Sequence, residues 1–533
     1  MSAAAPTAGT VPQRAPAAPK VAASEPPPLA GAQLAITALA LALGTFMQVL
    51  DSTIANVSLP TIAGNLGVSP DQGTWVITSF AVANGIGVPL TGWLMGRYGV
   101  VKTFVFSVIA FTVASLLCGV AWSLSSLIFF RILQGGTSGP MIPGSQALLI
   151  SIFPHSKRAT ALGIWSITTL VAPICGPILG GYISDNYHWG WIFLINVPVG
   201  LIVTVLTWRA LASRETPTRK LPIDMVGLGL LVVWVGALQI MLDTGKDADW
   251  FSSSTVVVEA IITGVFFVAF LIWELTETHP IVDLSLFKNR NFALGCLAFC
   301  LGYAVFFANN LLMPLWLQTQ IGYTATWAGL VAAPTGAIAV LLTPLSARMM
   351  AKIDARIIAT IAFIAFGASY LMRAGLTADA SFFAFVLPLL VQGIAMATFF
   401  LAMITILLDG VPPPRIPLAS GLSNFVRITA GGFAASVVTT IWDRREALHQ
   451  ARMADLTTAY SPAFNQTLAN LHRLGLPDLG AKASILRVMT SQAYLLSTDD
   501  IFWFSGWISF LLIGTVWLCR KAKSGGGAPV AAD

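Results

Sequence analysis

The sequence between residues 34 and 59 reads LAITALALALGTFMQVLDSTIANVSL and contains one charged side chain, Asp51. An apolar run of this length can cross the hydrocarbon core of a bilayer as an α-helix, which needs about 20 residues. Strands are usually far shorter. The segment therefore predicts a membrane-spanning helix with a carboxylate inside it.

Thirteen further apolar runs follow along the chain. They lie near 74–95, 101–120, 124–153, 161–183, 189–211, 223–243, 253–273, 292–316, 324–349, 356–374, 380–408, 417–442 and 499–519. The 533 residues are 56% hydrophobic and 10% charged, with a mean hydropathy of +0.79. This composition excludes a soluble globular protein and predicts an all-α membrane protein with 14 transmembrane helices.

The basic residues predict the orientation of these helices. Lys and Arg gather in alternate loops, among them Arg97 and Lys102, whereas the short loops on the other side hold only Lys246 and Arg373. Because cytoplasmic loops are enriched in Lys and Arg, both termini are expected in the cytoplasm of a bacterial cell with the chain in its inner membrane. The dispersed positive charge gives no basic face for nucleic acid.

Helix count and loop lengths divide the chain into five parts. We expect a disordered cytoplasmic tail over 1–32, a bundle of helices 1 to 6 over 33–212, an inserted pair of helices over 213–290, a bundle of helices 9 to 14 over 291–519, and a cytoplasmic tail over 520–533. The long hydrophilic segment 443–498 is expected outside the membrane with helical stretches. It either docks a partner protein or caps the transporter's own mouth.

Charged side chains deep inside the spans need a function or a buried partner, because each costs at least ~2.5 kcal/mol at the helix centre. Asp51 in helix 1 and Arg131 in helix 4 have similar expected depths. Burial and a nearby arginine act on a carboxylate's pKa in opposite directions, as a proton carrier requires. We predict a proton-coupling pair, with a permanent structural ion pair as the alternative.

Two more charged residues lie inside apolar runs. Glu259 is close enough to one membrane face to reach it by snorkelling. Arg427 stands beside Gly431 and Gly432 and is expected to hold an anionic group or a closed gate. No histidine is placed deep in a span, which leaves a carboxylate as the proton carrier.

No metal site or cofactor is predicted. Cys296 and Cys300 are four residues apart on one helical face, a spacing that a metal site can use. No His or carboxylate accompanies them, so we interpret them as packing residues. No catalytic cluster or substantial soluble domain is present, and this argues against an enzyme.

Several motifs resemble the major facilitator superfamily, specifically its fourteen-helix drug:proton antiporter branch and the EmrB-type multidrug efflux proteins. The resemblance covers residues 40–520. It is carried by LDSTIANVSLP at 50–60, GWLMGRYGVVK at 92–102, RILQG at 131–135 and APICGPILGG at 172–181. HWGWIFLINVPVG at 188–200, PID at 222–224 and LFKNRNF at 286–292 add to it, and these three are assigned structural roles.

The resemblance implies roles for some of these residues. It makes Asp51 the membrane carboxylate and Arg131 part of a proton relay, and it implies gating or packing roles for Arg97, Gly176, Pro177, Gly180 and Gly181. Gly96 replaces the acid that is usual in the family's cytoplasmic gating loop. The charge-locked gate of the family is therefore in question here.

The family's plan further implies a central cavity lined by helices 1, 4, 9 and 12. Polar residues expected to bind substrate there are Asn309, Asn310, Gln318 and Gln392, and the expected apolar and aromatic residues are Phe306, Phe307, Met313, Trp316, Met396, Phe399 and Phe400. Adaptable surfaces of this kind favour bulky hydrophobic ligands.

The expected function is proton-driven export of hydrophobic drugs or toxic compounds, a cause of antibiotic resistance, powered by the proton gradient without a cofactor. The resemblance also implies a periplasmic adaptor, an EmrA-type membrane fusion protein, and an outer-membrane channel as partners in a tripartite pump, besides membrane lipid. The alternative is a metabolite or fatty-acid carrier of the same fold, although few buried charges suit a polar metabolite.

Overall fold

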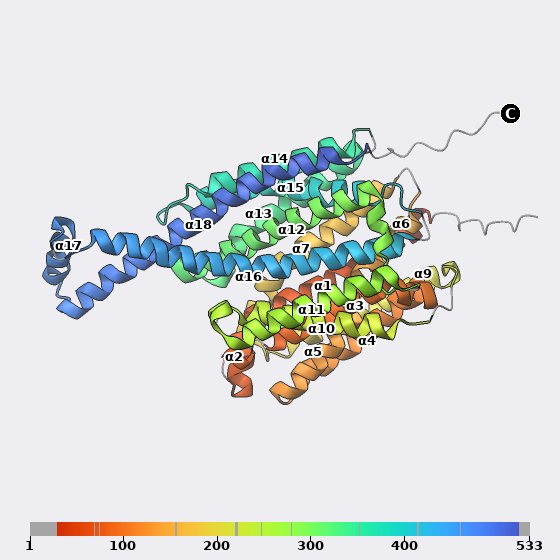
Figure 1. The fold of residues 1–533 in the computed structure, drawn as a ribbon, viewed down its shortest axis with the longest axis horizontal. Coiled ribbons are helices and arrows are strands. Elements are labelled where there is room, and N and C mark those ends of the chain that lie inside the picture. Colours follow the sequence, from red (N-terminus) through yellow and green to blue (C-terminus); the bar gives the residue numbers. More distant parts are fainter. Residues whose placement is uncertain are drawn as a thin grey trace, which may run out of the picture.

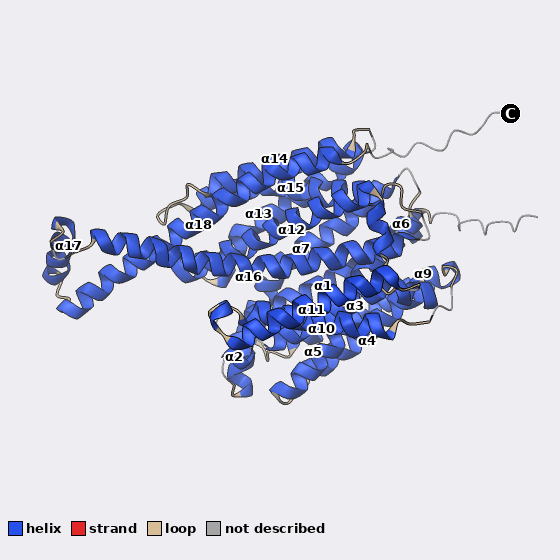
Figure 2. Ribbon diagram, in the orientation of Figure 1, coloured by secondary structure: helices blue, strands red, loops and turns tan. Residues whose placement is uncertain are grey.

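The computed structural model describes residues 29–521, except for 69, 74, 155–156, 219–221, 247, 279, 351, 413–414 and 459. This described part is built from helices and loops and contains no strand (Figure 2). Residues 1–28 and 522–533 lie outside the described part, and they make up most of the two tails predicted over 1–32 and 520–533. Both described ends of the chain lie at one end of the molecule, here called the terminal end, and helix α17 (Pro462–Arg473) marks the opposite, hairpin end (Figure 1).

The first bundle contains α1 (Gly31–Leu66), α2 (Pro70–Gly73), α3 (Trp75–Tyr98), α4 (Val100–Gly119), α5 (Leu124–Ser138), α6 (Met141–Ile152), α7 (Arg158–Asn186), α8 (Trp191–Leu194), α9 (Asn196–Leu211) and η2 (Ala212–Arg214). The predicted fourth span, 124–153, is broken between α5 and α6 at Gly139 and Pro140. In the described part of the chain, thirteen helices are long and apolar enough to cross a membrane, and the broken pair α5 and α6 corresponds to the remaining predicted span.

Glycines set the spacing between α3 and α5. A Cβ atom on Gly135 would lie 2.4 Å from the Phe80 carbonyl oxygen, and one on Gly139 would lie 2.2 Å from the Gly87 carbonyl carbon. Neither position can accept a side chain without moving a backbone. Small residues let membrane helices approach closely, and here they bring the second half of α5, which carries Arg131, against α3.

The inserted pair consists of α10 (Met225–Thr244) and α11 (Ser254–Thr276), with η3 (Trp250–Ser252) between them. Helix α10 packs on α3, where Val235 fills the space over Gly85. It also reaches the second bundle, because Ser436 donates a hydrogen bond to the Leu242 carbonyl oxygen at 2.7 Å. The inserted pair therefore contacts both bundles.

The second bundle contains η4 (Leu284–Lys288), α12 (Arg290–Trp316), the π-helical turn η5 (Leu317–Ile321), α13 (Ala325–Met350), α14 (Ala355–Arg373), α15 (Phe382–Leu408), α16 (Ile416–Leu456), α17 and α18 (Asp478–Leu518). Helices α16 and α18 run far past the other helices and, with α17, form a projecting hairpin (Figure 1). The hydrophilic segment 443–498, predicted as a connection with helical stretches, thus continues two spans almost without interruption.

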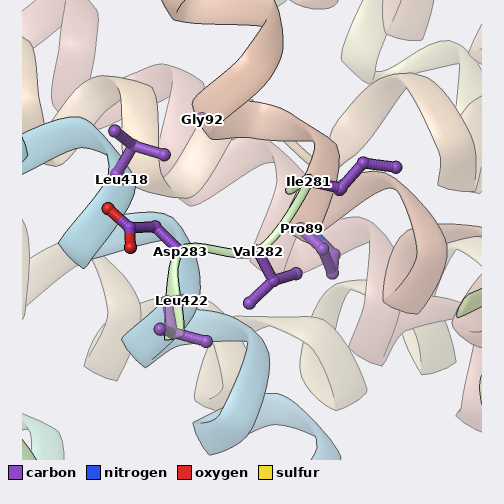
Figure 3. Close-up of a pocket in the computed structure, with 7 residues that line it drawn as sticks. All are labelled: Pro89, Gly92, Ile281, Val282, Asp283, Leu418 and Leu422. Atoms are coloured by element: carbon purple, nitrogen blue, oxygen red, sulfur yellow. The ribbon is translucent and has the colours of Figure 1, made fainter. Parts of the chain in front are cut away.

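Contacts at the terminal end join the two bundles. A Cβ atom on Gly92 of α3 would lie 2.5 Å from Leu418 of α16, and one on Gly163 of α7 would lie 3.0 Å from Thr343 of α13. Leu418 and Leu422 also border a small crevice that the 281–283 loop lines from the other side (Figure 3). The bundles are therefore packed together across the half of the molecule nearest the termini.

Candidate functional site

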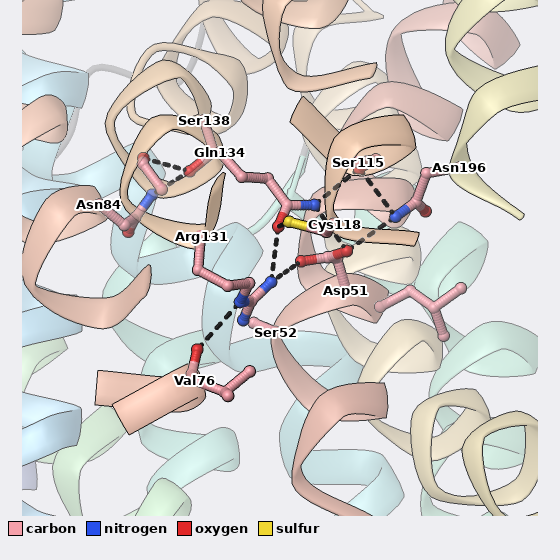
Figure 4. Close-up of polar contacts among 12 residues, drawn as sticks. Asp51, Ser52, Val76, Asn84, Ser115, Cys118, Arg131, Gln134, Ser138 and Asn196 are labelled. Atoms are coloured by element: carbon pink, nitrogen blue, oxygen red, sulfur yellow. Dashed lines mark hydrogen bonds and ion pairs between the residues drawn. The ribbon is translucent and has the colours of Figure 1, made fainter. Parts of the chain in front are cut away.

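A buried ion pair lies in the first bundle between α1 and α5. Arg131 Nη1 is 2.6 Å from Asp51 Oδ2, and the two side chains are 1% and 0% exposed. The other carboxylate oxygen of Asp51 accepts hydrogen bonds from Gln134 Nε2 at 2.9 Å and from Asn196 Nδ2 at 2.7 Å (Figure 4). Both oxygens of this carboxylate are therefore engaged by side chains from α5 and α9.

The guanidinium of Arg131 is held from several directions. Its Nε donates to the Val76 carbonyl oxygen at 3.0 Å, and its Nη1 also donates to Gln134 Oε1 at 2.7 Å. The guanidinium carbon, Cζ, lies 4.2 Å from the ring centroid of Phe80 and 5.4 Å from that of Phe193. Such contacts favour a cation and fix its orientation, so Arg131 presents one edge to the carboxylate.

A second layer of polar groups surrounds this pair. Ser115 of α4 accepts hydrogen bonds from Gln134 at 2.6 Å and from Asn196 at 3.3 Å, and the Cys118 thiol is 3.6 Å from Gln134 Oε1. We call Asp51, Ser115, Arg131, Gln134 and Asn196 the carboxylate cluster. It joins four helices of the first bundle, α1, α4, α5 and α9, in one network.

The sequence predicted the matched depth of Asp51 and Arg131, and the structure places them in contact. It did not identify Ser115 and it assigned Asn196 only a structural role. That assignment is revised, because Asn196 binds the carboxylate directly. The available signal was a lone amide inside the apolar run 189–211, next to no other polar residue that could satisfy it.

Two glycines of the 172–181 motif pack α7 onto α1 beside this cluster. A Cβ atom on Gly176 would lie 2.1 Å from Thr53 Oγ1, and one on Gly180 would lie 2.8 Å from the Ile54 carbonyl oxygen. Gly181 has nothing within 4 Å of its Cβ position, so the structure gives it no packing role. The side chain of Pro177 lies outside the described residues.

The loop between α3 and α4 lacks the acid that is usual in the family, because Gly96 replaces it. A carboxylate from elsewhere in the chain, Glu215, lies at this loop instead. Gly96 has open space at its Cβ position, and Arg97 lies 5.4 Å from the ring centroid of Trp93. Glu215, which follows η2, accepts hydrogen bonds from the backbone N–H groups of Val101 and Lys102 at 3.0 and 2.9 Å. A carboxylate from a distant part of the chain thus caps the start of α4.

The second bundle contains two buried arginines. Arg427 lies on α16 and is 4% exposed, as its position inside an apolar run suggested. Arg373 was predicted in a short outside loop, and that prediction is wrong, because it is 1% exposed and packs between the rings of Tyr370 and Phe502. No carboxylate among the described residues forms an ion pair with either of them.

Most residues expected to line a central cavity are instead packed inside the second bundle. Phe399 contacts the rings of Phe299, Phe363 and Phe366, which all belong to this bundle. The other buried members of the set are Phe306, Asn309, Met313, Trp316, Gln392, Met396 and Phe400. Asn309 donates to Ser505 of α18 at 2.9 Å, within the same bundle.

Only three members of that set remain outside the packed interior. Phe307 and Asn310 are half-buried, and Gln318 is exposed in the turn η5. The expected cavity lining is therefore corrected for the buried members. Apolar residues that face a cavity and apolar residues that fill a helix bundle look alike in sequence.

The described residues contain no group of three or more His, Cys, Asp and Glu side chains placed to hold a metal ion. Cys296 and Cys300 lie with their sulfur atoms 3.8 Å apart on α12 and are both buried. What the carboxylate cluster offers chemically is a single titratable carboxyl group whose ionised form accepts hydrogen bonds from side chains of α5 and α9. Moving those helices apart would change its proton affinity.

The chain is similar over nearly its full length to known transport proteins. The profile of the Major Facilitator Superfamily matches residues 41–436. The multidrug export protein EmrB of Escherichia coli strain K12 is 50% identical over 501 residues, 94% of this chain and 98% of that protein. The fatty acid resistance protein FarB of Neisseria gonorrhoeae is 48% identical over 502 residues, 94% of this chain and 99% of that protein.

A solved structure shares the fold at low sequence identity. The human organic anion transporter MFSD10 (TETRAN) aligns with a TM-score of 0.56 and 12% identity, covering 90% of this chain and 99% of that one. This likeness concerns the arrangement of the helices alone.

Proposed function

The chain belongs to the Major Facilitator Superfamily, and on that premise we propose that it is a proton-coupled antiporter that exports hydrophobic drugs or toxic compounds across the inner membrane. It is a multi-pass membrane transporter rather than an enzyme. The observation that supports proton coupling best is the buried carboxylate of Asp51, with both oxygens engaged by side chains of other helices.

The carboxylate cluster suits a carrier whose proton affinity depends on conformation. In the described arrangement, Arg131, Gln134 and Asn196 stabilise the ionised form of Asp51. A shift of α1 relative to α5 and α9 would lengthen these contacts and favour protonation of the buried group. Proton uptake at one membrane face and release at the other then drive the exchange for substrate, with no cofactor.

The test is proton-driven uptake of ethidium into proteoliposomes with an imposed proton gradient. Asp51→Asn keeps the size of the side chain and one acceptor oxygen but cannot ionise, and we expect uptake to fall by at least about 100-fold, because general proton transfer through this group is lost. Asp455→Asn is the matched control, since Asp455 is exposed on the projecting hairpin. Uptake by Asp51→Asn at the wild-type rate would refute the proton role.

We place the terminal end in the cytoplasm and the hairpin end in the periplasm, as the loop charges predict. A cysteine at exposed Leu474 of the hairpin should then react with a membrane-impermeant maleimide in intact spheroplasts. A cysteine at exposed Lys102 should react only after the membrane is opened. The reverse labelling pattern would invert the topology.

We also propose that the projecting hairpin contacts a periplasmic adaptor, an EmrA-type membrane fusion protein, which leads to an outer-membrane channel. The hairpin carries exposed apolar side chains near its tip: Tyr460 is 93%, Leu474 77% and Leu479 82% exposed. Apolar side chains exposed on an extension beyond the membrane favour a protein partner.

This interface can be tested by co-purification of the adaptor. Leu474→Glu combined with Leu479→Glu should abolish adaptor recovery, because two charges would be buried in an apolar contact. Asn470→Glu adds a charge at an exposed polar position of α17 and should leave recovery unchanged. Equal recovery of the adaptor with all variants would mean that the hairpin does not contact the adaptor.

A fatty-acid carrier of the same fold is the second candidate. The name of the Neisseria relative favours it, and so does the buried, uncompensated charge of Arg427. Both candidates export amphipathic compounds. The fatty-acid carrier differs from the drug exporter in that its substrate carries a carboxylate.

A further inference from the structure

A short loop packs where α3 and α16 meet at the terminal end. Residues 281–283 follow α11, and Ile281 and Val282 are 2% and 5% exposed. Both belong to the hydrophobic core that also contains Val88 of α3 and Leu422 of α16. The loop lines one side of the crevice between these two helices (Figure 3). It therefore adds apolar contacts between the bundles at this end.

A buried carboxylate holds the 281–283 loop in this place. Glu274 lies in the last turn of α11 and is 4% exposed. Its Oε2 atom accepts a hydrogen bond from the backbone N–H group of Val282 at 3.0 Å. That N–H group lies inside the core, where a buried donor needs a partner from the protein. Glu274 thus attaches the loop to the inserted pair.

A second polar attachment joins the loop to the start of the second bundle. Arg415, which precedes α16, has its Nη1 atom 3.8 Å from Asp283 Oδ2, and the arginine is 52% exposed. The other oxygen of Asp283 accepts from the backbone N–H group of Ser285 at 3.1 Å. A long, exposed ion pair contributes little to stability. The buried hydrogen bond from Val282 to Glu274 is therefore the stronger attachment.

The Glu274 carboxyl group is buried without a neutralising cation. Its Oε1 atom makes no hydrogen bond to a described residue. A Cβ atom on Gly227 would lie 2.8 Å from this oxygen and 2.2 Å from Asp224 Oδ2, so two carboxyl groups approach one point. No described basic side chain forms an ion pair with either acid. Burying an acid in this way costs free energy, and its bond to the loop offsets part of that cost.

The place of the loop matters because the gating loop between α3 and α4 lacks its usual acid, which Gly96 replaces. Closure at the terminal end then depends on other contacts, such as the packing of Gly92 against Leu418. The 281–283 loop adds to them from outside both helices. If α3 and α16 separated here, the apolar side chains of Ile281 and Val282 would lose their packing, which opposes opening.

We propose that the 281–283 loop locks the contact between α3 and α16 at the terminal end, and that Glu274 is the residue that positions this lock. The inference rests on the proposed antiporter function, because alternating access requires this end to open. While Glu274 holds Val282, the loop stays between the bundles and the closed terminal end is favoured. Loss of that hydrogen bond lets the loop move with one bundle and the other bundle separate from it.

The experiment measures distances between spin labels by double electron–electron resonance in the purified full chain in nanodiscs. Labels on cysteines at Lys102 of α4 and Lys352, between α13 and α14, span the bundles at the terminal end. Labels at Asn65 of α1 and Thr377, between α14 and α15, span them at the hairpin end. All four positions are exposed. Each pair reports the ratio of closed to open molecules at its own end.

Glu274→Ala leaves the buried N–H group of Val282 without an acceptor. The ratio of closed to open molecules at the terminal end should fall about tenfold, the scale of one lost hydrogen bond to a charged group. The labels at the hairpin end should move closer in the same molecules, since the two ends open alternately. Glu274→Gln keeps an acceptor oxygen for Val282, so its ratio should stay within about threefold of the wild-type value.

Glu259→Ala is the matched control. Glu259 lies on the same helix, is half-buried and also has one buried oxygen without a partner. It is about 22 Å from Glu274 along the axis of α11, at a rise of ~1.5 Å per residue, and so cannot hold the loop. Its removal should leave both distance distributions unchanged. Size-exclusion profiles and thermal unfolding of each variant exclude misfolding as the cause.

Three results would overturn the assignment: an unchanged terminal-end ratio in Glu274→Ala, an equal change in Glu259→Ala, or broadening of both distributions without opposite shifts at the two ends. The last would make Glu274 a residue of structure alone. If wild-type protein takes up ethidium under a proton gradient while any of these results is found, only the lock is refuted. If no uptake occurs, the antiporter proposal fails, and the distances still decide whether Glu274 holds this end closed.

Discussion

The two bundles carry polar residues at matching depth, but these residues differ in how completely their oxygen atoms are hydrogen-bonded. Asp51 lies about twenty residues into α1, and Asn309 lies about nineteen residues into α12, the first helix of the second bundle. Both oxygens of Asp51 are engaged by other helices. Asn309 donates to Val305 of its own helix and to Ser505, while its oxygen is buried without a partner.

Two buried arginines, one in each bundle, repeat the contrast. Arg131 binds a carboxylate, a glutamine and a backbone carbonyl. Arg373 has one hydroxyl partner and two aromatic neighbours. A buried arginine alone therefore does not make a proton site, and among the described residues only the first bundle pairs a buried arginine with a buried acid. The second bundle offers fixed charge at Arg373, which cannot bind and release a proton as a carboxylate does.

The largest expected effect comes from breaking the ion pair of the first bundle. Arg131→Gln leaves the buried carboxylate without its cation, which should cost about 3 kcal/mol and lower the apparent melting temperature in detergent. Adding Asp51→Asn removes the unpaired charge and should restore most of the stability. Proton-driven ethidium uptake should be absent from both variants, since neither keeps the working pair.

A single variant Arg131→Gln as stable as the wild-type protein would contradict this prediction. The buried pair would then contribute no net stability, and its role would be confined to transport. Uptake in the double variant would remove the carboxylate cluster from the coupling mechanism.

The second bundle should respond much less to the equivalent change. Arg373→Gln leaves no carboxylate unpaired, so we expect a stability loss of about 1 kcal/mol from the lost ring contacts. Ethidium uptake should stay within about threefold of the wild-type rate, since no proton-binding group is touched. A loss as large as that of Arg131→Gln would erase the contrast between the bundles.

Hydropathy predicted the helix count and the depth of Asp51 and Arg131, because both follow from the fixed rise per residue of an α-helix. It did not predict which residues surround the pair. That depends on how each helix is rotated about its axis, and lipid is as apolar as a packed helix face, so the rotation leaves little trace in composition. Ser115 and the role of Asn196 were missed for this reason.

The same limit explains the errors in the second bundle. Arg373 is the last residue of α14, where hydropathy cannot separate a buried helix end from a loop. Trp316 and Phe399 were assigned to a cavity because aromatic residues are common in both cavities and bundle cores. Segment 443–498 was predicted as a connection with helical stretches, but the sequence did not show that α16 and α18 continue their spans into it, because hydrophilic helices outside the membrane lack the apolar signal that marks a span.

A smaller change tests the amide of the carboxylate cluster. Asn196→Leu removes one donor from the Asp51 carboxylate while keeping a similar volume. The ionised form loses a hydrogen bond, so the pH dependence of uptake should shift relative to that of the wild-type protein. The uptake rate at neutral pH should fall about tenfold, in line with a lost hydrogen bond to a charged group.

Asn84→Leu is the control for this variant. Asn84 is buried in the same bundle and donates to Ser138 at 2.7 Å, away from the carboxylate (Figure 4). It should change stability without moving the pH profile. Identical pH profiles for Asn196→Leu and wild-type protein would reduce Asn196 to a structural residue, as the sequence suggested.

The smallest expected effect concerns the link between the inserted helices and the two bundles. Thr78 of α3 donates a hydrogen bond to Asp243 of α10, and Thr78 is two residues from Val76, whose carbonyl oxygen holds Arg131. On the other side of α10, Ser436 of α16 donates to the Leu242 carbonyl oxygen. The inserted pair is thus tethered to both bundles, but only one tether adjoins the carboxylate cluster.

Thr78→Val and Ser436→Ala remove these two tethers one at a time. Each should lower ethidium uptake by about two- to threefold, the scale of one neutral hydrogen bond. Only Thr78→Val should also move the pH dependence of uptake, because it loosens the segment of α3 that positions Arg131. Equal pH profiles for the two variants would mean that the inserted pair stabilises the packing of the bundles without affecting proton binding at Asp51.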